Sequence, residues 1–513
     1  MKPSQPALLE IPEQPLTPKA TSPKGPRKFR LVNREQTVIG TIYVEELLPA
    51  EHKARAIWEL VGRMDLSRFS EALRTTAGDV GRPAWDPHLL VSLWVYAYSE
   101  GISSAREIER SMEWEPAMQW LSGLERINHH TLSDFRVEHK AALDELFAEL
   151  LTILDQAGMV SLEQVMHDGT KIRAQAGADT FRRKESLQEK LQQAREAVKK
   201  MGDPTAAAPA RDRKQAARER ATRERCERLE AAAKELEVLQ SEKRKEADKA
   251  KARVSEQEPE ARLMKHGDHA FSPSYNAQIT TEASHKIIVG AHLSQSSSDA
   301  KSLQPALDEI KENLGALPKQ VVVDGGFTNR DTILHCAEKK IDLVGSLPDP
   351  RERSEAAMKA AGIHPDFAPG QFRILDQGAG LECPAGCLLE PLRLTYKRGD
   401  LYQQYRAEGV DCQGCDYREQ CCPRNAEKGR MVSIRLEEQA EVSAFRKKLE
   451  TEEYRKIYRR RSEVAEFPNA WLKEKLGLRK FRVRGKEKAG IELLWACLTY
   501  NILQWVRLKP AKA

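Results

Sequence analysis

The 513-residue sequence lacks any apolar run long enough to cross a membrane. A membrane-spanning helix needs about 20 consecutive, mostly apolar residues, and no such stretch occurs. The first 26 residues are polar and interrupted by proline, so they also lack the apolar core of a secretory signal. These two absences predict a cytoplasmic protein.

The sequence also has little apolar material for its length, with 40% hydrophobic and 31% charged residues. This balance is typical of a folded core that carries long, solvated helices, and the length predicts two or three domains. Disulfide bonds are rare in a reducing compartment. The nine cysteines are therefore predicted to be thiols or metal ligands.

Positive charge is unevenly distributed along the chain. The net charge is only +6, yet residues 455–488 contain 13 Lys and Arg against 4 Asp and Glu. A basic cluster of this kind is typical of a surface that binds a polyanion, most often nucleic acid. A solvated helix face without a partner has the same composition, and the sequence leaves both interpretations open.

The N-terminal part is predicted to consist of a disordered tail, residues 1–33, and a helical domain, residues 34–158. Two helices are expected in LLVSLWVYAYSEG and SSAREIERSM, and a third begins in HHTLSDFR, with Thr131 and Asp134 as its capping box. Short helices joined by tight turns fit a helix-turn-helix-like DNA-binding domain. They fit a plain helical bundle equally well.

The rest of the chain predicts an α/β core interrupted by two insertions. Apolar, strand-like runs alternate with amphipathic segments, which indicates a mixed sheet. The first insertion is a charged helical arm, because residues 181–260 carry 22 Lys and Arg, 17 Asp and Glu, and almost no aromatic residues. The predicted segments are the core at 159–178, 262–348 and 440–508, the arm at 179–261, and a cysteine-bearing insertion at 349–439.

Two aspartates follow apolar runs: Asp168 in MHDGTKIRAQAG and Asp324 in KQVVVDGGFTN. Open α/β sheets place catalytic groups at the carboxyl ends of strands, so the two acids converge if their strands are neighbours. Close carboxylates repel unless a cation lies between them, and hard oxygen ligands favour Mg²⁺ or Mn²⁺. Two such ions about 4 Å apart can promote phosphoryl transfer. Each Asp-Gly pair is, by itself, also a common turn former.

A two-ion site needs a third acidic ligand, and the basic segment near the C-terminus contains Glu463, Glu466 and, further on, Glu492. A glutamate in a strongly basic segment could bind a metal ion while the neighbouring Lys and Arg side chains contact the DNA phosphate. Beside the first aspartate, Lys171 and Arg173 are candidates for phosphate contacts. His167 is expected to have a structural role.

Several of these motifs, in this order, resemble one known family. SSAREIER with HHTLSDFR, then HDGTKIRAQAG, VVVDGGFTNRD and YRRRSEVAEFPNAWLKEKLG are similar to the DDE transposases of bacterial insertion sequences, in the Tyr-Arg-Glu-Lys signature superfamily, subgroup eleven-eighty-two. The resemblance implies an RNase H-like catalytic core with an Asp, Asp, Glu triad. Matched position by position, the triad is Asp168, Asp324 and Glu466.

The resemblance also implies the roles of several basic residues. The signature matches Tyr458, Arg461, Glu466 and Lys473, but four residues separate Arg461 from Glu466 where the superfamily has three, so Arg459 and Arg460 remain alternatives. Further phosphate contacts are expected from Arg479, Arg482 and Arg484. Terminal inverted repeats would be recognised by Ser103, Arg106 and Arg110 in the helical domain.

The cysteines near the C-terminal third have the spacing of a metal site. Cys383, Cys387, Cys412 and Cys415 form two pairs, which predicts a structural Zn²⁺ site, and Cys421 or Cys422 could replace a member. Unliganded thiols are the alternative.

The resulting prediction is a nucleoid-associated transposase that binds double-stranded DNA at the ends of an element and at its target. It would act as a homodimer in the DNA complex and join 3′ ends with two Mg²⁺ or Mn²⁺ ions. A metal-dependent nuclease without strand transfer and an inactive, zinc-bearing DNA-binding regulator are the alternatives.

Overall fold

The computed structural model describes residues 41–70, 84–201, 213–243, 245–347, 357–375, 379–397 and 400–508. The chain divides into two units, Met1–Tyr43 and Val44–Ala513, and the elements below belong to the second. The predicted disordered tail and residues 202–212 of the predicted arm lie outside the described residues. No helix of the described residues is both long and apolar enough to span a bilayer.

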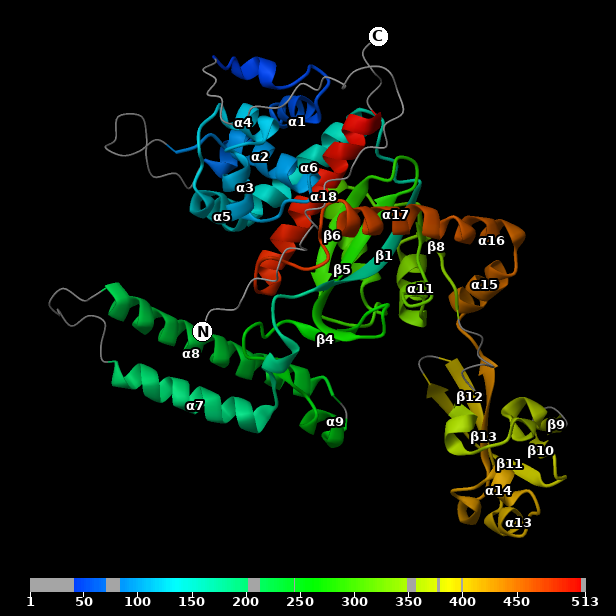
Figure 1. Ribbon diagram of the computed structural model, residues 1–513. Coiled ribbons are helices and arrows are strands. Elements are labelled where there is room, and N and C mark those ends of the chain that lie inside the picture. The colour runs from blue at the N-terminus through cyan, green and yellow to red at the C-terminus, as the bar shows by residue number, and fades with distance from the viewer. Residues whose placement is uncertain are drawn as a thin grey trace, which may run out of the picture. The chain divides into compact units, whose positions relative to one another are not determined.

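A six-stranded mixed sheet forms the centre of the second unit (Figure 1). The strands follow the order β4-β5-β1-β7-β8, and β6 also pairs with β5. Pairing is antiparallel between β1 and β5 and between β5 and β6, but parallel from β1 to β7 and from β7 to β8. The strands are β1 Gln164–Arg173, β4 Arg262–Lys265, β5 Phe271–Glu282, β6 Ile288–Ser294, β7 Gln320–Val322 and β8 Asp342–Val344.

Helices connect and cover these strands. The parallel strands require crossovers, which α10 and α11 supply because each lies between successive strands in the sequence. The C-terminal α17 contacts β1 and β5, and α18 contacts β6. The bounds are α10 Leu303–Leu314, α11 Arg330–Glu338, α15 Ala440–Leu449, α16 Glu452–Arg459, α17 Arg461–Glu474 and α18 Lys486–Leu508.

The N-terminal helices share one hydrophobic core with the sheet and with α18, which contacts α1, α2, α5 and α6 (Figure 1). Their bounds are α1 Lys53–Val61, α2 Pro87–Ser99, α3 Ala105–Ser111, α4 Pro116–Ser122, α5 His129–Glu138 and α6 Lys140–Gln156. The predicted long third helix is broken at His139, whose φ of −109° and ψ of 47° are not helical. The capping-box prediction was wrong, because Asn128 caps α5 by accepting a hydrogen bond from His130 N.

The arm contains the two predicted charged helices, α7 Lys184–Lys200 and α8 Arg213–Ser241, which lie side by side (Figure 1). They have a small core of their own, in which Leu187 and Leu191 of α7 and Leu229 and Leu236 of α8 are buried. The short elements α9 Glu246–Ala250, β2 Phe181–Arg182 and β3 Val254–Ser255 complete the arm.

A second, five-stranded antiparallel sheet, in the order β13-β12-β11-β10-β9, forms most of the cysteine-bearing insertion. Its strands are β9 Arg373–Leu375, β10 Gly380–Glu382, β11 Leu388–Lys397, β12 Asp400–Ala407 and β13 Met431–Glu437, with the short helices α13 Gly409–Gln413 and α14 Arg418–Cys421 after β12. This sheet also has a core of its own, centred on residues such as Leu381, Leu389 and Tyr405.

Candidate active site

The strand register brings Asp168 and Asp324 together. β1 pairs in parallel with β7, and the last paired residues are Met166 and Val322. Asp168 lies two residues after Met166, and Asp324 lies two residues after Val322. If the same register continued, the two aspartates would be side by side. Asp168 is not at the end of its strand as predicted, because β1 continues to Arg173 by pairing with β5. The charge of Asp324 acts on Asp168, which agrees with the expected proximity of the two acids.

The electrostatics of Asp168 reflect this crowding. Burial raises the pKa of Asp168 to about 6, the positive charge of Arg461 opposes the rise, and the charges of Asp324 and Asp299 add to it. Its carboxylate accepts hydrogen bonds from Gly169 N at 2.9 Å and from Asn469 Nδ2 at 3.0 Å. Asp324 Oδ1 accepts a hydrogen bond from Gly326 N at 2.7 Å.

The helix α17 supplies the next groups. Asn469, which contacts Asp168, is 8% exposed, and its Oδ1 has no hydrogen-bond partner. Glu466 lies three residues before it and is exposed, and Lys473 lies four residues after it. Residues three or four apart are neighbours on a helix face, so Glu466, Asn469 and Lys473 share one face. Pro468 lies inside this helix and does not end it.

Glu466 makes no recorded contact with either aspartate. Among the described residues, no three His, Cys, Asp or Glu side chains are arranged to hold a metal ion. Burial lowers the pKa of Lys473, the charge of Arg479 lowers it further, and the charge of Asp168 opposes this effect. Lys473 is therefore close enough to the acids to act on them electrostatically.

The alternatives for the third acid and for the signature arginine have different surroundings. Glu463 pairs with Lys286 at 3.5 Å, and Glu492 is buried and accepts a hydrogen bond from Arg482 N at 2.8 Å. Arg459 pairs with Glu452 at 3.1 Å. Arg461, in contrast, acts on Asp168.

The signature tyrosine lies close to that arginine. The Arg461 guanidinium lies 6.0 Å from the centre of the Tyr458 ring, and the Tyr458 hydroxyl donates a hydrogen bond to Ser346 Oγ at 3.3 Å. Ser346 follows β8, so α16 is anchored next to the end of the parallel strands. The structure thus places Arg461, Asn469 and Lys473 near Asp168, and Tyr458 next to Arg461.

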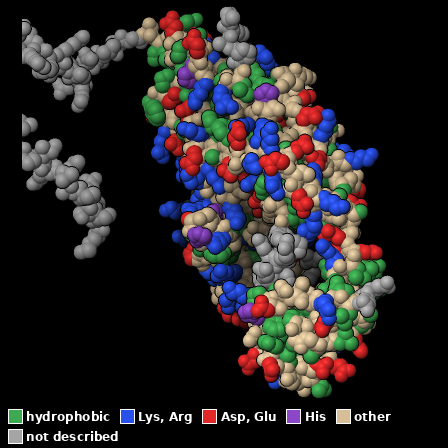
Figure 2. Space-filling view, turned by 90° about the vertical axis from the view of Figure 1, so that its right-hand side faces the viewer, with side chains coloured by type: hydrophobic (Ala, Val, Ile, Leu, Met, Phe, Trp, Pro, Cys, Tyr) green, Lys and Arg blue, Asp and Glu red, His purple; other side chains and the backbone are tan. Residues whose placement is uncertain are grey.

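The remaining predicted phosphate contacts are dispersed. Lys171 Nζ donates to the backbone of Lys265, Arg173 lies 3.5 Å from Asp268, and Arg479 pairs with Glu474. Arg482 and Arg484 are exposed. On the face drawn in Figure 2, the described Lys and Arg side chains are interspersed with Asp and Glu side chains.

The predicted recognition residues of the helical domain differ in accessibility. Arg106 and Arg110 are exposed on α3. Ser103 is only 5% exposed, its carbonyl accepts a hydrogen bond from Arg136, and its hydroxyl accepts one from Arg482 Nε at 3.3 Å. Ser103 thus links the residues before α3 to Arg136 of α5 and to Arg482 before α18, and its contact with DNA stays a prediction.

The six predicted metal-site cysteines surround one small cavity of about 20 Å³, lined by Cys383, Cys387, Cys412, Cys415, Cys421 and Cys422. All nine cysteines of the chain are free thiols. Burial raises the pKa of Cys387, Cys412 and Cys421, the last to about 11. Thiols have the donor chemistry that zinc prefers, but no three of these thiols are arranged to hold an ion, so the predicted zinc site and its ligand set stay a prediction.

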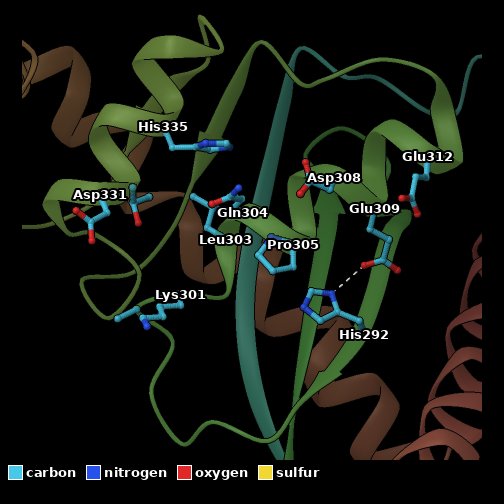
Figure 3. A pocket seen from close by; sticks show the side chains of 12 residues that line it. His292, Lys301, Leu303, Gln304, Pro305, Asp308, Glu309, Glu312, Asp331 and His335 are labelled. Carbon is cyan, nitrogen blue, oxygen red and sulfur yellow. Dashed lines mark hydrogen bonds and ion pairs between the residues drawn. The ribbon is translucent and has the colours of Figure 1, made fainter. Parts of the chain in front are cut away.

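A much larger hollow, of about 730 Å³, lies between α10 and α11 (Figure 3). His292 there pairs with Glu309 at 2.9 Å. The charged residues that line it are mostly acidic, namely Asp308, Glu309, Glu312 and Asp331 against Lys301. Such a lining repels phosphate, so this acid-lined hollow does not fit a DNA backbone.

The sequence interpretation missed two side chains of the site. Asn469 carried a signal, because it lies between Glu466 and Lys473 on the face they share. Asp299 lies in the run SQSSSDA, a few residues after β6 ends at Ser294. An acid shortly after a predicted strand was the sequence feature that could have indicated it. The effect of its charge on Asp168 places it near the two predicted aspartates.

Two family models match the chain. One, described as a transposase DDE domain, matches residues 382–506, and the other, described as a transposase domain (DUF772), matches residues 42–138. The first range contains Glu466 and the cysteine cluster but neither Asp168 nor Asp324. No curated protein matches the chain.

Among solved structures, the chain is similar to a piggyBac transposase in a synaptic complex with hairpin DNA. The identity is 8% and the TM-score 0.23, over 90% of this chain and 82% of that chain. A similarity at this level does not establish a shared fold. Over these two ranges, which together cover less than half of the chain, the sequence is similar to DDE-type transposases, and this similarity indicates an enzyme.

Proposed function

We propose that the protein cleaves phosphodiester bonds at the ends of an insertion sequence and joins the freed 3′ ends to target DNA. The observation that carries this proposal is the position of Asp168 and Asp324 just beyond the last parallel pair of β1 and β7, with α17, which bears Glu466, Asn469 and Lys473, packed beside Asp168. The sheet order, with three antiparallel strands followed by two parallel ones, supports an RNase H-like core.

The donor set fits a pair of divalent ions. Its carboxylates are hard oxygen ligands, the pKa of Asp168 is raised in part by its acidic neighbours, and the Asn469 Oδ1 oxygen is buried without a partner. Asp168, Asp324 and Glu466 would hold Mg²⁺ or Mn²⁺. When bound, two such ions increase the nucleophilicity of water or of a 3′-hydroxyl and stabilise the leaving oxygen.

The chain's own residues would position the DNA. Arg461, Tyr458 and Lys473 would hold the backbone beside the scissile phosphate, since Arg461 and Lys473 act on Asp168 and Tyr458 lies next to Arg461. Hydrolysis breaks the bond between phosphorus and the 3′-oxygen, and releases a 3′-hydroxyl and a 5′-phosphate. That hydroxyl then attacks a target phosphodiester and displaces its 3′-oxygen, so bonds are exchanged without an external energy source.

The other domains would serve recognition and assembly. The helical domain, through Arg106 and Arg110, would bind the terminal inverted repeats, and a homodimer would bring two ends together. The cysteine cluster would hold one structural Zn²⁺. Membership of the eleven-eighty-two subgroup remains part of the proposal, because the family matches are less specific than that.

The test is an incubation of the protein with DNA that carries its own flanking repeats, in Mg²⁺, followed by mapping of the cuts. Cuts at the element ends and covalent joining of pre-cleaved ends are expected. Cuts without joining would favour the nuclease alternative. Binding without any metal-dependent cut would favour the regulator.

A further inference from the structure

The strand β11 has a long open edge in the five-stranded sheet. Its neighbour β10 pairs with it only at Leu388 and Leu389, whereas β12 pairs with its other side as far as Lys397. Among the described residues, no backbone hydrogen bond joins residues 392–397 to an element other than β12. The backbone groups that point away from β12 are therefore free to pair with another strand.

This open edge carries exposed apolar side chains. Leu392, Leu394 and Tyr396 are 49%, 57% and 73% exposed, and as alternate residues of a strand they point to the same face of the sheet. An exposed apolar edge strand is a template for pairing with another chain, so proteins usually shorten it, cover it or place charges on it. Three such side chains on one open edge indicate a surface that another strand covers.

The charged side chains of this strand do not protect the edge. Arg393 Nε donates a hydrogen bond to Gln404 Oε1 of β12 at 3.1 Å. Lys397 Nζ donates to Ser433 Oγ of β13 at 3.3 Å and lies 5.5 Å from the centre of the Tyr402 ring. Both side chains thus reach across the sheet toward β12 and β13, away from the open edge.

The sequence of this edge, LRLTYK at residues 392–397, suits antiparallel pairing with a second copy of itself. In a pair centred on Leu394, this residue lies opposite its own copy, and Leu392 lies opposite Tyr396. Apolar side chains of both chains then pack together on one face. The pair is two-fold symmetric and therefore closed, whereas pairing between two different edges would extend into a filament.

Charge favours this register over the adjacent ones. With Leu394 at the centre, Arg393 lies opposite the uncharged Thr395 of the second copy. With Thr395 at the centre, Arg393 would lie opposite Lys397, and with Arg393 at the centre, it would lie opposite its own copy. Like charges directly opposite each other destabilise a strand pair, so of these three registers the one centred on Leu394 avoids repulsion.

We propose that β11 is a dimerisation surface, at which two copies of this chain join their five-stranded sheets by antiparallel pairing centred on Leu394. This surface deepens the proposed function, since it is where the homodimer of that function would form, and its biological role rests on that function. The pairing itself requires neither DNA nor metal, because residues of this sheet alone form it.

The test is sedimentation velocity of the full-length protein without DNA, over a series of concentrations. The wild type should form dimers, and Leu394→Lys should weaken dimerisation at least about tenfold, because two like charges would meet at the symmetry axis. Leu436→Lys is the matched control, since Leu436 is 53% exposed on β13, the opposite edge of the same sheet, and it should leave dimerisation unchanged. Thermal unfolding checks the folding of both variants.

A variant that strengthens the contact tests the register. Thr395→Glu would set a carboxylate opposite Arg393 of the second copy, twice in each dimer, and should tighten dimerisation about three- to tenfold. If Thr395 lay at the centre instead, the same change would set two carboxylates against each other. Weaker dimerisation of Thr395→Glu would therefore contradict the proposed register.

Three results would overturn the surface as a whole. They are a wild type that stays monomeric at every concentration, dimerisation that Leu394→Lys does not change, and larger oligomers that Leu394→Lys and Leu436→Lys both abolish. The last result would indicate pairing of β11 with β13.

The surface and the catalytic proposal fail in different ways. A monomeric wild type that still cuts and joins element ends in Mg²⁺ would refute the dimerisation surface and leave the proposed cleavage and joining intact. Dimers that Leu394→Lys dissociates, without any metal-dependent cut by the wild type, would refute the proposed chemistry and leave the surface intact.

Discussion

Two regions of this protein gather possible metal ligands, and they do so by different physical means. At the parallel strands, carboxylates lie close together, and their mutual repulsion helps to raise the pKa of Asp168. Around the small cavity of the second sheet, six thiols lie together, and burial raises the pKa of several of them. Crowded carboxylates favour a cation, whereas protonated thiols can pack without one. Proximity alone therefore argues more strongly for metal at the first region than at the second.

The largest effect expected is loss of DNA cleavage on removal of one triad acid. Asp168→Asn, Asp324→Asn and Glu466→Gln should each lower the cleavage rate at least about 1,000-fold, because each would lose an ion ligand, while DNA binding measured by gel shift persists. Glu463→Gln is the matched control on the same helix, since Glu463 pairs with Lys286 instead. Cleavage at the wild-type rate by a triad variant would remove that residue from the site.

The second expected effect concerns the cysteines. If the thiols hold an ion, purified protein should contain about one Zn²⁺ per chain, and Cys383→Ser combined with Cys412→Ser should abolish this content and lower the Tm. Cys336→Ser, a buried thiol on α11 outside the cluster, is the control for zinc content. Elemental analysis that finds no zinc in the wild-type protein would contradict this prediction. Only the carboxylate region would then be a candidate metal site.

A smaller effect is expected at the signature arginine. Arg461→Ala should lower the cleavage rate about 10- to 100-fold, because its charge acts on Asp168 and would contact the scissile phosphate. Arg459→Ala removes an equal charge that is paired with Glu452, and should change the rate little. Single-turnover kinetics on a repeat-end substrate would measure both. The reverse ranking would assign the signature position to Arg459.

The smallest effect is on stability. The pKa of Asp168 is raised to about 6, above the usual value of about 3.9, so the folded state binds this proton more tightly than the unfolded state. The stability of the metal-free protein should therefore fall as pH rises from about 4 to about 6. Asp168→Asn removes this cost and should stabilise the metal-free protein at pH 7 by about 1–2 kcal/mol.

Denaturant unfolding at pH 4 and pH 7, without and with Mn²⁺, would measure this difference. The gain should be small at pH 4, where Asp168 is protonated in the folded state, and it should shrink at pH 7 when Mn²⁺ stabilises the wild-type protein. A variant less stable than the wild type at pH 7 without metal would show that Asp168 is not under electrostatic strain.

Local sequence patterns predicted many elements correctly, because periodicity and apolar runs reflect burial. The alternation of strands and helices from β5 to β8 and the charged helical arm are examples. The break at His139 and the cap at Asn128 were missed, since the apolar spacing continues across the break. The buried position of Ser103 was missed as well, because it depends on Arg136 and Arg482, which are distant in sequence.

The sequence by itself determined which chemical groups are available: two acids after apolar runs, a basic segment that contains glutamates, and paired cysteines. Tertiary structure alone decided which of these groups meet. The parallel register of β1 and β7 sets Asp168 beside Asp324, and the packing of α17 on β1 brings Asn469 to Asp168. Such contacts depend on register and packing between distant segments, which no local pattern encodes.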